Sequence, residues 1–144
     1  MANPREMLKK AMDSDKDYDE SPKGEEAICE LISRAFTTRN LLHFAHWNTK
    51  SFAQHLAVGD LYDSIIDNID EIVETYQGKY GLIDDLKTNA CELPDNILAH
   101  VKEEAKWVEN NRSKIACNST AIENLVDNLI GSYHKTVYKL TNLA

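Results

Sequence analysis

Two histidines and a row of carboxylates in the first half of the chain have types and spacings that could bind a metal ion. His46 and His55 lie nine positions apart, and an acidic stretch follows them. At ~100° per residue of an α-helix, five of these acids fall within one sector of ~80°. They are Asp60, Asp63, Asp67, Asp70 and Glu74. Imidazole nitrogens and carboxylate oxygens together form a donor set that suits iron, manganese or zinc.

Both features also have a structural interpretation that needs no metal. Like charges at i,i+4 on a helix cost only roughly a few tenths of a kcal/mol per pair. The five acids can therefore lie on a helix face that is simply exposed to solvent. A single histidine on the apolar side of a helix is more often a hydrogen-bonded core residue than a ligand. The spacing alone therefore leaves a metal site and a structural site both open.

The elements that must position these residues are two helices joined by a short turn. Apolar residues recur at three- and four-residue steps from residue 25 to about 47 and again from 52 to about 77, as expected of helices with one buried face. Ser51 begins an S-x-x-Q capping box at the start of the second helix. The short turn makes the helices antiparallel neighbours, so His46 at the end of the first helix comes near His55 in the second.

Glycines and a charged tail mark the limits of these helices. Gly78 and Gly81 lie just past the predicted end of the second helix, where glycine commonly stops a helix. Residues 81–93 are then expected to form a long connection or a short helix. At the other end of the chain, residues 1–24 are expected to form a tail with a candidate short helix over residues 4–12.

Two further helices complete the predicted fold. Pro94 with Asp95 opens a third helix that reaches about residue 115. A second capping box, from Thr120 to Glu123, opens a fourth helix that continues to the end of the sequence. We therefore predict an all-α protein, an antiparallel four-helix bundle over residues 25–144.

The composition argues against several classes of protein. Sixteen Lys and Arg against 24 Asp and Glu give a net charge of −8, which repels the phosphate backbone, so a nucleic acid is not an expected partner. No apolar run approaches the ~18 residues that span a membrane, and the start of the sequence lacks the apolar core of a signal peptide. Three scattered cysteines without CxxC spacing are typical of a reducing cytosol, so we expect a cytoplasmic protein.

The sequence around the histidines resembles the motif of the Dps mini-ferritins. His46-Trp47-Asn48 is followed by His55, and Asp70 and Glu74 form a D-x-x-x-E pair whose aspartate comes fifteen residues after His55. In that family, the two histidines of one subunit and the acidic pair of another build a ferroxidase site across a two-fold interface. The resemblance implies a ferritin-like four-helix bundle that forms a homodimer or a larger cage.

The function implied by this resemblance is iron binding and oxidation, for iron storage or for protection against oxidative damage. The implied ligands of Fe²⁺ are His46, His55, Asp70 and Glu74, with Asp60 or Asp67 as an auxiliary ligand. Peroxide or oxygen would oxidise the bound iron, and a cage would collect the ferric mineral. Zinc and manganese are alternative metals for the same donors.

Two departures from the family and one further resemblance support a different class of function. The carboxylate that the family places four residues after its second histidine falls on Gly59, and the turn between His46 and His55 is shorter than in the family. These histidines, together with the Y-Q-G-x-Y-G pattern at residues 76–81, are similar to small ferritin-like proteins encoded by bacteriophages. The alternative is therefore an inactive ferritin-like structural or assembly protein, present in an infected cell or a virion.

Overall fold

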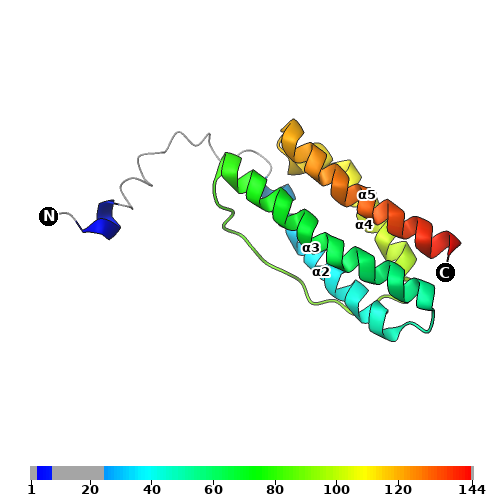
Figure 1. The fold of residues 1–144 in the computed structure, drawn as a ribbon. Helices are drawn as coiled ribbons and strands as arrows, with labels where there is room; N and C mark the ends of the chain where they lie inside the picture. Colours follow the sequence, from blue (N-terminus) through cyan, green and yellow to red (C-terminus); the bar gives the residue numbers. More distant parts are fainter. Residues whose placement is uncertain (1–2, 8–24, 144) are drawn as a thin grey trace.

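The computed structural model describes residues 3–7 and 25–143, and within these ranges it contains helices, turns and loops but no strand. Four long helices pack as a bundle (Figure 1). They are α2 (Glu25–Asn48), α3 (Phe52–Tyr80), α4 (Ile97–Ile115) and α5 (Thr120–Asn142). Residues 4–7 form a single helical turn. The rest of the predicted tail helix lies outside the described residues.

Each long helix contacts two others, so that the four form a ring in the order α2, α3, α5, α4. Neighbours in the ring are antiparallel. For example, Asp60 near the start of α3 pairs with Lys139 near the end of α5. The buried core between the helices is largely aliphatic, and Tyr76 and Tyr133 are among its largest fully buried side chains. The prediction of an all-helical bundle is thus confirmed.

A long crossover of residues 81–96 joins α3 to α4 and contains no helix. It runs back along the length of the bundle beside α2 (Figure 1), so α4 starts at the same end as α3. Asn89 fixes its middle to α2, because the Asn89 carbonyl accepts a hydrogen bond from the Thr37 hydroxyl and the Asn89 amide donates to the Ser33 hydroxyl. Of the two predicted alternatives, the long connection is correct.

Helix starts and ends follow the predicted signals only in part. Ser51 caps α3 as expected, since its hydroxyl accepts from the Gln54 amide at 3.2 Å. Gly78 does not stop α3, which continues to Tyr80. Gly81 ends it with φ of 95°, in the left-handed region that favours glycine.

The two later helix starts were predicted at the wrong residues. The N-cap of α4 is Asn96, whose side chain accepts from the Ala99 amide, two residues after the proline that was expected to open the helix. Thr120 is the first residue of α5 rather than its cap, and the N-cap Ser119 makes no side-chain capping bond. The carboxylate of Glu123 instead binds Arg112 of α4, so a contact between helices replaces the predicted capping box.

None of the helices in the described part of the chain has the length and apolar character that crossing a membrane requires.

Candidate metal centre

The turn between α2 and α3 brings the two predicted histidines into direct contact. The ring N–H at Nδ1 of His46 donates to the backbone carbonyl of His55 at 2.8 Å. The Nδ1 N–H of His55 donates in return to the carbonyl of His46, also at 2.8 Å. The two rings stack with their centroids 3.5 Å apart and their planes inclined by 21°. Both imidazoles are therefore held in one orientation by a reciprocal pair of bonds.

These bonds determine which nitrogen of each ring is available to a ligand. A carbonyl oxygen can only accept, so the proton of each neutral ring is assigned to Nδ1. The lone pair of each ring then lies on Nε2, and neither Nε2 has a hydrogen-bond partner among residues 3–7 and 25–143. A metal-bound histidine commonly has this arrangement, with one nitrogen on the metal and the other donating to a carbonyl or carboxylate. The same bond also has a structural use, because the His46 carbonyl lies in the last turn of α2, where helical partners are missing.

Gly59 provides the space that the His46 ring occupies. A Cβ atom added to Gly59 would lie 3.1 Å from Nδ1 and 3.2 Å from Cε1 of His46, closer than ordinary van der Waals contact. A carboxylate side chain at this position would therefore require the His46 ring to move. The departure from the mini-ferritin pattern at residue 59 is thus coupled to the packing of the first histidine.

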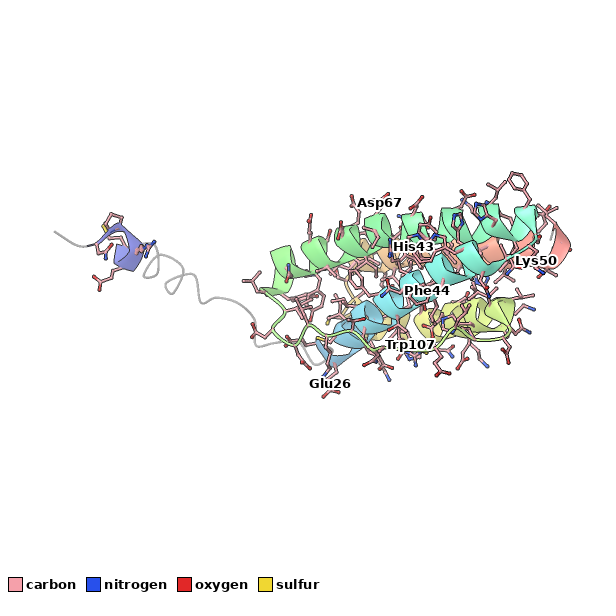
Figure 2. The ribbon with its side chains drawn as sticks, turned by 90° about the horizontal axis from the view of Figure 1, so that it is seen from below. Glu26, His43, Phe44, Lys50, Asp67 and Trp107 are labelled. Carbon is pink, nitrogen blue, oxygen red and sulfur yellow. The ribbon has the colours of Figure 1, made fainter. Side chains whose placement is uncertain are left out.

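Aromatic rings surround the histidine pair on the outer face of α2 and α3. His43 stacks on Tyr62 at 4.4 Å and lies 4.3 Å from Trp47. It belongs to the last third of α2, on the side facing α3 (Figure 2). The Arg39 guanidinium lies 5.5 Å from the centre of the Tyr62 ring. Trp47 is 68% exposed, so this aromatic group reaches the surface beside the histidines.

The predicted carboxylate ligands do not meet the histidines within one chain. Asp70 and Glu74 are exposed on α3, and the fifteen positions from His55 to Asp70 correspond to ~22 Å along a helix. Asp67 points away from the bundle (Figure 2), and Asp60 binds Lys139 at 3.0 Å. Among residues 3–7 and 25–143, no group of three or more His, Cys, Asp and Glu side chains is placed to hold a metal ion.

An ion pair between Arg34 of α2, which is partly exposed, and the buried Glu104 of α4 was not predicted. Glu104 is 6% exposed and binds Arg34 at 2.9 Å through Oε1, while its Oε2 has no hydrogen-bond partner among the described residues. Burial raises the pKa of the Glu104 carboxyl, against the opposing effect of Arg34. The sequence signal was its position in the apolar stripe of α4, between Val101 and Val108, where a glutamate is out of place.

The two histidines outside the centre have ordinary partners. His100 is half-buried and its Nε2 lies 3.0 Å from the Thr38 hydroxyl, and burial lowers the pKa of this imidazole. His134 is exposed and pairs with Glu109. These contacts identify the two side chains as ordinary core and surface histidines.

Comparison with known proteins gives a family and one relative. The profile of a family of unknown function, DUF5856, matches residues 46–140. This range contains His46, His55 and the five α3 carboxylates that fall within one sector, from Asp60 to Glu74. A protein of Enterobacteria phage T4, described as an uncharacterized 14.6 kDa protein in the mobD-ri intergenic region, is 25% identical over 126 residues, which span 87% of this chain and 95% of the phage protein. No solved structure matches.

Proposed function

Starting from the fact that the chain belongs to DUF5856, a family of unknown function, we propose that it is a ferritin-like, Dps-type protein that binds Fe²⁺ as its substrate. One long crossover between the second and third helices of a four-helix bundle is the connectivity of ferritin-like folds. The path of residues 81–96 between α3 and α4 supports that classification.

The observation that carries the proposal is the state of the two histidines. His46 and His55 have their Nδ1 protons engaged by carbonyls and their Nε2 lone pairs free. Two imidazole nitrogens leave a metal ion in need of further ligands. The carboxylates that the family pattern supplies, Asp70 and Glu74, lie fifteen and nineteen residues after His55 on the same helix, which is ~22 and ~28 Å along its axis. A second chain packed antiparallel on α3 brings its Asp70 opposite His55. The proposed site is therefore shared by two copies.

The chemistry of this donor set fits iron. Two imidazoles and two carboxylates are borderline and hard donors that suit Fe²⁺, and carboxylates stabilise the Fe³⁺ product. Electrons would pass from Fe²⁺ to peroxide or oxygen, which the solution supplies. Zinc and manganese suit the same donors without this oxidation. The relative from phage T4 supports a place for the protein in an infected cell.

A second candidate function is a structural or assembly role in a phage particle, without metal chemistry. The reciprocal histidine bonds favour it, because they already fasten the end of α2 to the start of α3 with no ligand. The glycine at position 59, where the mini-ferritins have a carboxylate, also favours the structural role.

The two candidates differ in what they predict for His55→Asn. The asparagine amide can replace the Nδ1 donor toward the His46 carbonyl but has no counterpart of Nε2. If His55 is a ligand, the variant should retain most of its stability in chelator but lose tens-fold or more in metal affinity. A metal at a hundred times its Kd raises the free energy of unfolding by ~2.7 kcal/mol, so melting with and without Fe²⁺ under anaerobic conditions, or Zn²⁺, reports the loss.

Mixing variants tests whether the site is shared. Asp70→Asn, at an exposed position, should also abolish the metal-induced shift. In a dimer of one His55→Asn chain and one Asp70→Asn chain, one of the two sites keeps both intact partners, so half of the metal capacity should return. His134→Ala is the control, because it removes an exposed histidine from α5. A full metal-induced shift in His55→Asn would contradict the ligand assignment and favour the structural role.

A further inference from the structure

The outer face of α2 and α3 carries an apolar projection at one end and an apolar groove at the other. The projection, here called the aromatic knob, consists of Trp47, Phe52 and Leu56, which are 68%, 75% and 49% exposed. It lies beside the histidine pair, where α2 ends and α3 begins. Exposed apolar groups of this size, gathered in one place, are typical of an interaction surface.

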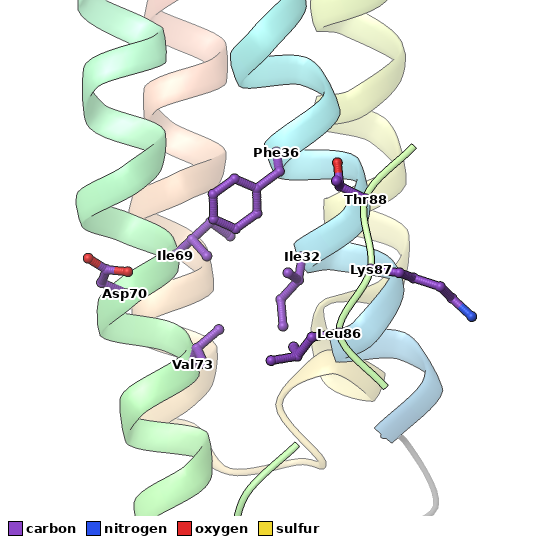
Figure 3. A pocket seen from close by; sticks show the side chains of 8 residues that line it. All are labelled: Ile32, Phe36, Ile69, Asp70, Val73, Leu86, Lys87 and Thr88. Atoms are coloured by element: carbon purple, nitrogen blue, oxygen red, sulfur yellow. The ribbon is translucent and has the colours of Figure 1, made fainter. Parts of the chain in front are cut away.

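The groove has a volume of about 460 Å³ and lies between α2, α3 and the crossover. Figure 3 shows Ile32 and Phe36 of α2, Ile69 and Val73 of α3 and Leu86 of the crossover converging on it. Asp70, one of the two predicted acidic ligands, belongs to its rim. Each end of this face therefore combines an apolar feature with one half of the proposed metal site.

We infer that the groove receives the aromatic knob of a second copy of this chain, in the same two-fold dimer that would assemble the metal site proposed above. In a two-fold contact that packs α3 against its copy in antiparallel orientation, positions at equal distances on either side of the axis lie opposite one another. His55 and Asp70 are opposite if the axis crosses α3 midway between them, between Tyr62 and Asp63.

The apolar residues require the same axis. The midpoint of Phe52 and Val73 lies between Tyr62 and Asp63, and so does the midpoint of Leu56 and Ile69. The knob and groove residues of α3 are thus brought together by the operation that pairs histidine with aspartate.

Helix α2 gives an independent check of this position. Trp47 and Ile32 have their midpoint between Arg39 and Asn40. Arg39 lies over the ring of Tyr62, so the midpoints on α2 and α3 are at the same level of the bundle. A single axis, perpendicular to both helices, therefore satisfies the one apolar pair of α2, the two apolar pairs of α3 and the metal site.

One feature opposes the contact. Asp63 is exposed and lies next to the inferred axis, so the two Asp63 carboxylates of the dimer come close together. Arg39 at the same level provides a cation to offset them. Because residue 63 lies next to the inferred axis, a cysteine at this position would lie close to the same cysteine of the second copy. Asp63 is therefore the most informative position to modify.

The experiment uses the full chain with Cys91→Ser, which removes the exposed native thiol. Mild oxidation of the Asp63→Cys variant should give a covalent dimer on a non-reducing gel, whereas Lys135→Cys, on the exposed side of α5, should not. Phe52→Ser should weaken dimerisation by ~10-fold or more, measured by sedimentation. Tyr138→Ser, which removes another exposed aromatic side chain, this time from α5, should leave it unchanged.

The outcomes separate this inference from the proposed function. A dimer with the Asp63 cross-link that binds no Fe²⁺ or Zn²⁺ would support the interface and refute the metal site. A monomer, or a dimer that cross-links through Lys135→Cys but not Asp63→Cys, would overturn the interface.

Discussion

Gly59→Ala tests the close contact between Gly59 and the ring of His46, which the orientation of that ring requires. In a helix interior, alanine is more stable than glycine by ~0.5–1 kcal/mol, so the substitution would stabilise α3 if there were space. The added Cβ would lie 3.1 Å from His46 Nδ1, and the His46 ring is also stacked on the ring of His55, with the centroids 3.5 Å apart. The ring can move away only by weakening its bond to the His55 carbonyl.

The expected magnitude follows from these opposing effects. Overpacking costs ~1–3 kcal/mol and a weakened hydrogen bond ~0.5–1.5 kcal/mol, which together exceed the helical gain. Gly131→Ala is the matched control, because Gly131 lies within α5 and nothing lies within 4 Å of its added Cβ. We expect Gly131→Ala to stabilise the protein by ~0.5–1 kcal/mol. Gly59→Ala should be less stable than this control by the sum of the two costs, ~1.5–4.5 kcal/mol.

Urea unfolding in chelator, at matched oligomeric state, measures the difference without a contribution from bound metal. For a chain of this size, ~1 kcal/mol corresponds to a change of a few degrees in Tm, so thermal melting gives a second measurement. If Gly59→Ala stabilises the protein as much as Gly131→Ala does, the His46 ring does not lie against Gly59, and the explanation given for the missing carboxylate is wrong.

Two further substitutions test other parts of the bundle. Gly81→Ala should destabilise the protein by ~1 kcal/mol in thermal melting, because residue 81 has φ of 95° and a side chain is strained there; an unchanged Tm would contradict that conformation. Because burial raises the pKa of Glu104, the stability contributed by its protonated form is present below the ordinary carboxyl pKa and is lost as pH rises through the raised value. Glu104→Gln should therefore remove this loss of stability with rising pH, measured by urea unfolding from about pH 4 to about pH 8. A dependence of stability on pH identical to that of the wild type would refute the raised pKa of Glu104.

Local signals predicted the helices well, and non-local contacts explain most of the errors. The cap of Ser51 on the Gln54 amide involves residues three apart, so the pattern alone is sufficient. Glu123 has the same pattern relative to Thr120, but Arg112 from another helix binds its carboxylate. Gly78 was taken as a helix end, although one glycine costs a helix only ~1 kcal/mol and Tyr80 packs against the buried Tyr76.

The candidate site was predictable as a set of residues but not as an arrangement of atoms. The short turn between α2 and α3 was enough to place His46 near His55. The reciprocal bonds and the contact of His46 with Gly59 depend on side-chain rotamers, which a periodic pattern does not specify. In the proposed shared site, the position of Asp70 relative to a histidine would depend on how two copies pack, and this information would lie in the complementarity of a surface rather than in the order of residues.

The crossover of residues 81–96 has a consequence for assembly. It divides the chain into two hairpins, α2–α3 and α4–α5, each closed by a tight turn, and residues 84–92 in its middle are exposed throughout. The contacts of α2 with α4 and of α3 with α5 can form between hairpins of two chains as well as within one. A tether of this length gives its own hairpin an effective concentration near the millimolar range, so the closed monomeric fold is favoured in dilute solution. During refolding at high concentration, the same tether allows chains to exchange their second hairpins.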